Sequence, residues 1–359
     1  MTYPINKDNK FNKRIDALPR DIYTLLSQID QLKGRWVGGV GFGSQILGRL
    51  RKFALVTSAG ASTRIEGSQM SDEEVRRLVD GLKVTTLRER DAEEVKGYVD
   101  AWNFIHDNYK DIELTENHIK ETHQILLKYS SKDVSHRGEY KHMPNDVVAK
   151  NQDGQVVGVV FKTMSPLQTP LAMEELVAWL NYAAESQQYH PLLIVASFVV
   201  EFLRIHPFID GNGRMSRLLT DLLMLKNDFS YVDYVSMERI IEEEKADYYI
   251  ALRKSQNTFD SDAESIEDWT RFFLSACLEQ AKRANSLISE ESLQTHLSKS
   301  QLEVYQIAAS LGEFAIRDIE ARTQIPRPTI KQAIEKLLSL SIIEAYGAGR
   351  STRYKMKKK

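Results

Sequence analysis

The chain has 359 residues, of which 42% are hydrophobic and 27% charged, with a net charge of −2 and one cysteine, Cys277. This composition is typical of a soluble globular protein with two or three domains, and a single cysteine excludes internal disulfides and thiolate metal clusters. The longest apolar run, residues 192–200, is too short to span a membrane, and the polar start is unlike a signal peptide. We therefore expect a cytoplasmic protein.

The charge is distributed unevenly along the chain. Residues 298–359 carry 12 Lys and Arg against 6 Asp and Glu, whereas the rest of the chain carries 36 against 44. A basic segment at the end of an acidic body predicts a separate module with its own binding role.

Most of the chain has the apolar periodicity of α-helices. Thr115 is the expected N-cap of one helix, and Leu171, Leu176 and Leu180 mark the apolar repeat of another. Residues 190–205 are apolar almost all round, which is typical of a helix buried at the centre of a bundle. The pattern predicts helices over residues 91–106, 115–129, 171–184, 190–205, 214–226, 238–256 and 266–288.

One segment breaks the helical pattern. An apolar pair at 147–148, an Asp-Gly turn at 153–154 and an apolar run at 156–161 predict a β-hairpin. The polar stretch 289–300 predicts a domain boundary. The fold class is therefore mainly α: a helical bundle with a β-hairpin, followed by a small C-terminal domain.

The sequence HPFIDGNGRMSR, residues 206–217, follows the central helix and leads into the next one. Gly211 and Gly213 let the backbone approach a ligand closely, and the free N–H groups at a helix start bind anions. Arg214 and Arg217 are three residues apart and share a helical face, so both can reach phosphates bound at the loop. The loop is therefore a candidate phosphate site.

Two further residues of the loop can supply chemistry. Asp210 can hold Mg²⁺ against phosphate oxygens, and a neutral His206 can take a proton from an attacking hydroxyl. Taken singly, each feature has a simpler explanation: a packed histidine, a tight turn or a solvated pair of arginines. Their occurrence together, in this order and between two helices, favours the phosphate site.

Residues 206–217 also carry a resemblance to a known family. They match the signature of Fic-domain proteins, His-Pro-Phe-x-Asp/Glu-Gly-Asn-Gly-Arg-x-x-Arg, at every defined position. Fic proteins transfer AMP from ATP to a hydroxyl side chain of a target protein. The related Doc-type kinases alter the Gly-Asn-Gly-Arg-x-x-Arg portion, which this sequence keeps. The resemblance therefore implies nucleotidyl transfer, by in-line attack on the α-phosphorus with pyrophosphate leaving, rather than phosphoryl transfer.

The resemblance also implies roles for individual residues. His206 would deprotonate the Ser, Thr or Tyr hydroxyl of the target, Phe208 would anchor the loop in the core, and Asp210 would bind Mg²⁺ at the ATP phosphates. The phosphates would be held by Gly211, Asn212, Gly213, Arg214 and Arg217, the last of these at the γ-phosphate.

In the family, a β-hairpin upstream of the signature lays its backbone along the target segment, a form of β-augmentation. The hairpin predicted above lies at the expected place. The alternative is a simple surface hairpin. The working strand would consist of Val160, Phe161, Lys162 and Thr163.

Tyr248 and Tyr249 resemble the paired tyrosines that lie near the adenine in the family, and Gln256 is a further candidate for the base or ribose. The alternative is core packing of a tyrosine pair.

Residues 61–67, ASTRIEG, contain Ser62, Glu66 and Gly67 in the spacing Ser-x-x-x-Glu-Gly. Taken alone, this spacing predicts a short helix with an N-cap serine that ends at glycine. It also resembles the Fic inhibitory motif, whose glutamate pairs with the second arginine of the signature. The resemblance implies that Glu66 pairs with Arg217 and keeps ATP in an unproductive pose. The same glutamate can instead position a water for removal of AMP, and the sequence leaves the two roles open.

The C-terminal segment predicts helices over 301–311 and 316–321, a third helix opening at residue 325, and a hairpin formed by 342–346 and 351–355. This order resembles a winged helix-turn-helix. DNA binding and protein interaction both remain open for such a module. The recognition helix would present Arg327, Thr329, Lys331 and Gln332, and the wing Arg350 and Arg353.

The expected domains are an N-terminal helical region with the inhibitory motif (1–110), a Fic catalytic core (111–288) and the winged helix (289–359). The first hypothesis is an autoinhibited protein adenylyltransferase that uses ATP and Mg²⁺ and modifies a target protein and itself. The alternatives are a DNA-binding regulator with a nucleotide-sensing core, and an enzyme that mainly removes AMP. The target, and whether the protein is a monomer or a homodimer, are left open.

Overall fold

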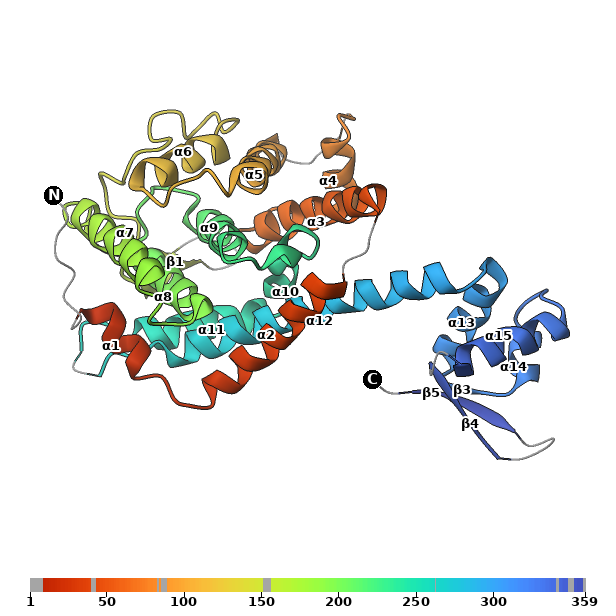
Figure 1. Ribbon diagram of the computed structural model, residues 1–359. Coiled ribbons are helices and arrows are strands. Elements are labelled where there is room, and N and C mark those ends of the chain that lie inside the picture. The colour runs from red at the N-terminus through yellow and green to blue at the C-terminus, as the bar shows by residue number, and fades with distance from the viewer. Residues whose placement is uncertain are drawn as a thin grey trace. The chain divides into compact units, whose positions relative to one another are not determined.

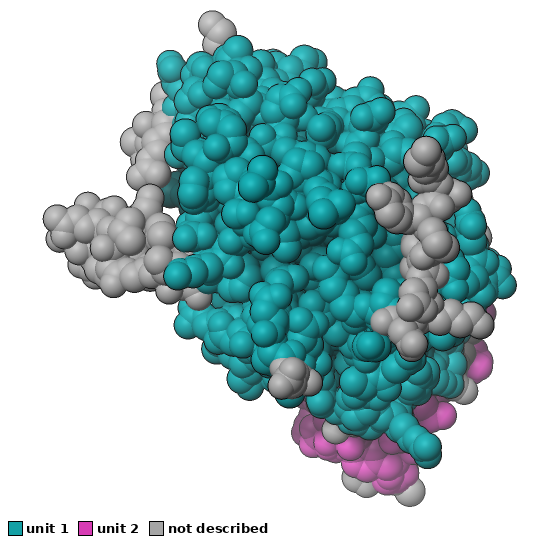
Figure 2. Space-filling view, turned by 90° about the vertical axis from the view of Figure 1, so that its left-hand side faces the viewer, with its two compact units in different colours: residues 1–285 teal, residues 286–359 magenta. Residues whose placement is uncertain are grey.

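The computed structural model describes residues 9–39, 43–82, 84, 89–150, 156–261, 263–339, 342–347 and 352–357, without the side chains of 147–150, 156–160 and 289–296. The chain divides into two units, residues 1–285 and 286–359, which are coloured separately in Figure 2. The predicted regions 1–110 and 111–288 thus fall almost entirely within one unit, because the N-terminal helices pack on the core helices.

The first half of unit 1 is helical (Figure 1). Thr115 caps the sixth helix by accepting a hydrogen bond from the His118 N–H, as the sequence predicts. Ser71 and Glu74 form a capping box at the fourth. The helices are α1 (Lys10–Asp16), α2 (Ile22–Gly39), α3 (Ser44–Ile65), α4 (Asp72–Val79), α5 (Glu89–Asn108) and α6 (Glu116–Leu126).

The second half of unit 1 begins with two antiparallel strands, β1 (Val147–Lys150) and β2 (Val156–Phe161), in which Val147 pairs with Phe161. They are the two segments that the sequence predicts for the hairpin, whose turn lies outside the described residues. The following elements are α7 (Thr169–Ser186), α8 (Pro191–Ile205), α9 (Asn212–Lys226), the 3₁₀ turn η1 (Ser230–Asp233), α10 (Met237–Glu243), α11 (Lys245–Gln256) and α12 (Glu267–His296).

Helix α8 is the centre of unit 1, as its apolar sequence predicts: every residue from Leu192 to Ile205 is buried. It contacts α1, α7, α9 and α11. In Figure 1, α7 and α8 lie side by side, and α9 leads away from the loop that follows α8. A loop fixed between two buried helices is a rigid place for a functional site.

Three sequence predictions differ from the structure. The helix expected over 238–256 is two helices, because the chain turns at Glu244. Leu171 is 69% exposed, because it lies in the first turn of α7 outside the core. The expected polar boundary at 289–300 is helical as far as His296, where α12 ends, since Glu and Gln side chains suit an exposed helix as well as a linker. Among the described residues, no helix has the length and apolar content needed to cross a membrane.

Gly97 sets the approach of α5 to α6, the helix that carries part of the site described below. A Cβ atom at residue 97 would lie 1.9 Å from the backbone oxygen of Leu126. We expect Gly97→Ala to lower the free energy of unfolding by about 2 kcal/mol, because backbone atoms of two packed helices must separate. In the matched control Gly34→Ala, nothing lies within 4 Å of the added Cβ, so we expect no loss. Urea unfolding of both variants tests this; equal stability would contradict it.

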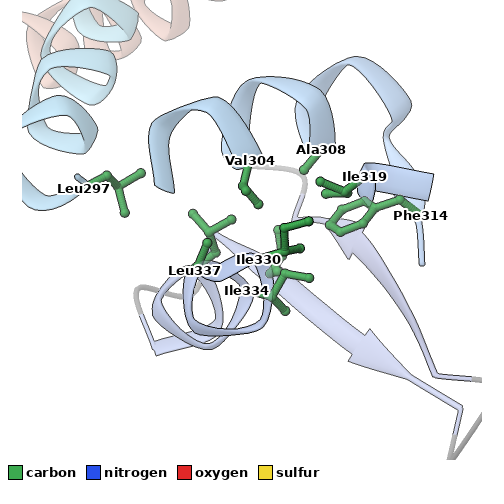
Figure 3. Close-up of a cluster of buried hydrophobic side chains, with 10 residues drawn as sticks. Leu297, Val304, Ala308, Phe314, Ile319, Ile330, Ile334 and Leu337 are labelled. Carbon is green, nitrogen blue, oxygen red and sulfur yellow. The ribbon is translucent and has the colours of Figure 1, made fainter. Parts of the chain in front are cut away.

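Unit 2 consists of α13 (Lys299–Leu311), β3 (Glu313–Phe314), α14 (Ile316–Glu320), α15 (Arg327–Ser339), β4 (Ile343–Tyr346) and β5 (Arg353–Met356). The sheet is antiparallel with strand order β3-β5-β4. Figure 3 shows the apolar side chains that the three helices and the sheet enclose, among them Val304, Phe314, Ile330 and Leu337. The sequence analysis missed β3, because two residues carry no periodicity. Unit 2 therefore has its own hydrophobic core, which is a defining feature of an independent domain.

Candidate functional site

Residues 206–211 form the loop between α8 and α9. His206 is the C-cap of α8 with φ 53° and ψ 60°, and its N–H donates to the Phe202 carbonyl at 2.8 Å. The left-handed conformation is unfavourable for a histidine and needs the surrounding structure to hold it. Gly211, with φ 83°, is the N-cap of α9. The helix starts at Asn212, two residues earlier than the sequence predicts, so its first free N–H groups face the loop.

The side chains of Phe208 and Asn212 hold the loop together. Asn212 accepts a hydrogen bond from the Phe208 N–H at 2.9 Å and donates to the Phe208 carbonyl at 2.7 Å. Phe208 is fully buried, as its predicted anchoring role requires. The Asn212 side chain thus holds the loop, and its backbone N–H and its second Nδ2 proton remain for a bound anion.

His123, on α6, is a residue that the sequence analysis missed. Its ring stacks on Phe208 at a centroid distance of 3.7 Å. Nδ1 accepts from the Gly138 N–H at 2.9 Å, so Nε2 carries the proton and donates to the Asp210 carbonyl at 3.0 Å. Burial lowers the pKa of His123 to about 4, so the ring is neutral at physiological pH. A lone histidine in an amphipathic helix gives no sequence signal for this positioning role.

The pKa of His123 predicts a pH dependence of stability. Between pH 6.5 and 4 the unfolded state binds a proton at this residue and the folded state does not. Its contribution is therefore fully present above pH 6.5 and is lost as the pH falls towards 4, by about 3 kcal/mol in total. We expect the free energy of unfolding of His123→Gln to fall less steeply over this range than that of the parent protein. Parallel curves in urea titrations would contradict this.

His206 is placed to act as a base. Its Nδ1 lies 3.2 Å from the Leu203 carbonyl and donates to it, which leaves Nε2 as the acceptor. Burial lowers the pKa of His206 to about 4, and the positive charge of Lys141 acts in the same direction. The imidazole is therefore neutral at physiological pH and able to accept a proton.

Arg214 and Arg217 lie on the first two turns of α9, and both are buried. Nε and Nη1 of Arg214 and Nη1 of Arg217 lack a hydrogen-bond partner among the described residues. Arg214 Nη1 also lies 3.7 Å from Glu94 Oε2, which is an ion pair beyond hydrogen-bond distance. Buried guanidinium donors without hydrogen-bond partners are costly, unless an anion binds them. The two arginines therefore mark an anion site at the N-terminus of α9.

The structure pairs Arg217 with the residues of the Ser-x-x-x-Glu-Gly motif at the end of α3. Arg217 donates to Glu66 Oε1 at 2.8 Å, to Ser62 Oγ at 2.8 Å and to the Ser62 carbonyl at 3.0 Å. Burial opposes the charge of Arg217, but the Glu66 carboxylate outweighs it and raises the pKa of the arginine. Gly67, with φ 104°, ends the helix there. A Cβ atom at Gly213 would lie 2.2 Å from Glu66 Oε1, so Glu66 reaches across the start of α9.

Asp210 lies at the entrance of the loop. Lys132 Nζ contacts its Oδ2 at 2.8 Å, Arg214 contacts its Oδ1 at 3.2 Å, and Arg90 lies 3.9 Å from Oδ2. Burial would raise the pKa of Asp210, but Arg214 and Lys132 hold it well below its usual range. The carboxylate is therefore ionised. The sequence analysis missed Lys132 and Arg90, which lie outside the motif.

The few oxygen ligands near Asp210 limit the kind of metal site that can form there. Among the described residues, no group of three or more His, Cys, Asp or Glu side chains could bind a metal ion. Mg²⁺, however, is often held by one carboxylate together with nucleotide phosphates. The single carboxylate of Asp210 fits that mode and no all-protein metal site.

A cavity of about 470 Å³ joins these groups, and its volume suits a small-molecule ligand. Tyr248 is buried and Tyr249 is 39% exposed. Their rings meet edge to face at a centroid distance of 5.1 Å. The lining includes Glu66, Phe161, His206, Asp210, Gly211, Asn212, Gly213, Arg214, Tyr248, Tyr249 and Gln256.

The residues predicted for the hairpin strand have different positions. Phe161 lines the cavity, whereas Lys162 lines a second cavity of about 350 Å³ beside Arg204 and Asp260. Thr163 is held by its neighbours: its N–H donates to Asp146 Oδ1 at 2.9 Å. The side chain of Val160 lies outside the described residues.

Comparison with known proteins places this site in a family context. Residues 113–224 match the model of the Fic/DOC family. Over 285 residues the chain is 27% identical to the Drosophila grimshawi protein named "Protein adenylyltransferase Fic", covering 74% of this chain and 54% of that protein. It is 28% identical over 212 residues to the protein of the same name from Drosophila persimilis, covering 58% and 38%. The chain thus spans about half, or less, of the length of these relatives.

Solved structures show the same fold. A Fic family protein from Desulfovibrio desulfuricans has 24% identity and a TM-score of 0.63, over 96% of this chain and 98% of that one. A Fic domain containing signaling protein from Bacteroides thetaiotaomicron has 24% identity and a TM-score of 0.60, over 73% of this chain and 98% of that one. The segment that holds the loop, its arginines and His123 thus matches the Fic/DOC family model and shares the fold of these two structures.

Proposed function

We propose that this Fic-domain chain is a nucleotidyltransferase that moves AMP from ATP to a Ser, Thr or Tyr hydroxyl of a target protein and of itself. The observation that carries the proposal is one cavity lined by His206 and by Arg214, whose Nε and Nη1 lack hydrogen-bond partners among the described residues. His206 is neutral, and Arg217 lies one helical turn further along α9, where it pairs with Glu66. A base beside an anion site at a helix N-terminus suits attack of a hydroxyl on a nucleotide phosphate. The name shared by the Drosophila relatives supports the same activity.

The proposed reaction assigns one step to each group of the loop. Nε2 of His206 takes the proton of the target hydroxyl, and the oxygen forms a bond to the α-phosphorus of ATP. The bond between that phosphorus and the bridging oxygen breaks, and pyrophosphate leaves with its charge neutralised by Arg214, Arg217 and the N–H groups of residues 211–213. Positioning and charge neutralisation supply most of the rate. Asp210 would hold Mg²⁺, which supplies further charge neutralisation at the phosphates when bound.

The contact of Glu66 with Arg217 would inhibit the transfer. Arg217 cannot bind the γ-phosphate while its guanidinium is held by Glu66 and Ser62. Arg217 is buried but the Glu66 side chain is 34% exposed, so inhibition would be relieved when a signal or a target moves the Glu66 side chain or the end of α3. Both inhibitory residues lie in the same chain as the site, so the inhibition is internal.

The two ends of the cavity would bind the adenosine and the target segment. Tyr248, Tyr249 and Gln256 would bind the adenosine, since aromatic rings and an amide suit a base and a ribose. The edge of β2 that does not pair with β1, continued by residues 162–163, would pair with the target segment and would bring its hydroxyl near His206.

Unit 2 would be a winged helix-turn-helix in which α15 is the recognition helix. Arg327, Lys331 and Gln332 are exposed on α15, which suits contact with a phosphate backbone. Thr329 is partly buried, Arg353 lies within 4 Å of the carboxylates of Glu313 and Asp318, and Arg350 is outside the described residues. Unit 2 would bind duplex DNA to direct the enzyme. Equal binding of duplex DNA by the parent chain and by Arg327→Ala/Lys331→Ala would contradict this.

The activity can be tested with ATP that is labelled at either the α- or the γ-phosphate. We expect Glu66→Gly protein with Mg²⁺ to retain the α-label covalently and to release the γ-label, with a mass increase of one AMP group. Retained γ-label would indicate phosphoryl transfer instead. Retention of neither label, with ATP shown to bind, would contradict AMP transfer to the protein itself.

A further inference from the structure

Lys141 is a buried lysine that lies against the catalytic loop. The residue is only 3% exposed, and no carboxylate of the described residues lies within 4 Å of its Nζ. Nζ donates to three neutral oxygen atoms: Asn145 Oδ1 at 2.8 Å, the Ile205 carbonyl at 2.9 Å and Thr163 Oγ1 at 3.0 Å. A buried ammonium held by neutral acceptors is costly. Its presence points to a function at this place.

The segment that begins at Lys141 binds four successive carbonyl groups around His206. Lys141 Nζ binds the carbonyl of residue 205, and its backbone N–H binds that of residue 207 at 2.8 Å. Asn145 Nδ2 donates to the carbonyl of His206 at 3.0 Å and to that of Phe208. These bonds fix the backbone on both sides of His206, whose left-handed conformation is otherwise unfavourable.

Lys141 also joins this loop to the strand that would hold the target. Thr163 follows β2 by two residues, and its hydroxyl lies between Lys141 Nζ and Asn145 Oδ1. The distance between His206 and the end of the hairpin is therefore set by the ammonium group of Lys141 and by the side chains of Asn145 and Thr163, which it binds. An arrangement of this kind is rigid, because every proton of the ammonium is used.

We propose that Lys141 is a positioning residue, which sets His206 relative to the hairpin strand and places a positive charge near its imidazole. This inference rests on the proposed role of His206 as the base. The charged groups that act on His206 are Lys141, which disfavours the imidazolium, and Glu66 and Asp210, which favour it. Burial lowers the pKa of Lys141 to about 8, and the nearby carboxylate of Asp146 acts in the opposite direction.

The test compares Lys141→Met with Lys120→Met in the full-length Glu66→Gly protein. Lys120 lies over the ring of the neighbouring Tyr140 at 4.2 Å, so it controls for loss of a nearby lysine. The first measurement is the NMR titration of the His206 ring, assigned by comparison with His206→Gln. The second is the rate of label transfer from α-labelled ATP to the protein itself, measured against ATP concentration and pH.

We expect Lys141→Met to raise the pKa of His206 by about one unit, because a nearby positive charge is removed. Transfer should fall at least about tenfold in kcat, with an unchanged KM for ATP, and the acidic limb of its pH profile should move to higher pH. Lys120→Met should change none of these. An unchanged His206 titration together with unchanged kcat would overturn the inference.

Thr163→Val tests the link to the hairpin separately and covers the case in which Lys141→Met does not fold. It leaves the ammonium in place, so kcat should fall while the His206 titration stays as in the parent. If Thr163→Val transfers AMP at the parent rate, the link to the hairpin is overturned. If the Glu66→Gly parent transfers no AMP at any pH, the proposed function fails, and the titration of His206 still decides whether Lys141 controls its charge.

Discussion

Replacing Glu66 by glycine should increase the rate of AMP transfer about ten- to a hundredfold. The Glu66 carboxylate has no proposed part in catalysis. It forms an ion pair with Nη2 of Arg217 at 2.8 Å. Once Arg217 is free, it can make a charge-assisted contact with the γ-phosphate. A hydrogen bond to a charged group contributes about 1.5–3 kcal/mol, and each 1.4 kcal/mol corresponds to about a tenfold change in rate. Initial rates with α-labelled ATP measure the effect.

Graded variants separate loss of inhibition from loss of structure. Glu66→Gln keeps the size of the side chain but loses its charge, so it should activate less than glycine. Ser62→Ala removes only the 2.8 Å contact to Arg217 Nε and should activate least. Ser68→Ala, whose hydroxyl accepts a hydrogen bond from the Met70 N–H, is the matched control and should transfer at the parent rate. A wild-type protein as active as Glu66→Gly would show that the pair does not inhibit.

Replacing His206 by alanine in the active Glu66→Gly protein should lower transfer by about 10²- to 10⁴-fold, the usual contribution of a general base. Nucleotide binding should persist, because the arginines and the N-terminus of α9 are unchanged. Transfer and ATP binding, the latter by titration calorimetry, are the two measurements. His118→Gln is the control substitution. His118 lies on α6, where its ring contacts the hydroxyl of the N-cap Thr115. Equal transfer by His206→Ala and its parent would exclude His206 as the base.

The sequence is informative about the site where its residues are adjacent in the chain. Residues 206–217 predict a loop between two helices, and the structure places that loop after the buried α8. The pairing of Glu66 with Arg217 spans 151 residues, yet the resemblance to the Fic inhibitory motif predicts it. Both predictions rest on a motif with a fixed spacing.

Residues that act from a distance without a motif are not predictable in this way. His123 and Lys141 look ordinary in the sequence, since a single histidine or lysine is usually solvated or packed. Their importance appears only when the fold brings α6 and residues 141–145 against the loop. Lys132 and Arg90 reach Asp210 from two other parts of the chain and are hidden for the same reason.

The fold predictions that were wrong have simple physical causes. The pattern over 238–256 has a single helical period, and no Gly or Pro marks the turn at Glu244. Residues 289–296 are polar enough for a linker, but helix propensity extends α12 through them. The two-residue β3 is stabilised by pairing with β5, which lies about 40 residues later in the chain.

The most direct test of the central claim is the amount of α-label that wild type, Glu66→Gly and Glu66→Gly/His206→Ala each transfer to protein under the same conditions with Mg²⁺. We expect weak labelling of the wild type, strong labelling of Glu66→Gly, and labelling of the double variant that is about 10²- to 10⁴-fold weaker than that of Glu66→Gly. Equal labelling of all three, or no labelling of Glu66→Gly while it binds ATP, would contradict an autoinhibited AMP transfer that depends on His206.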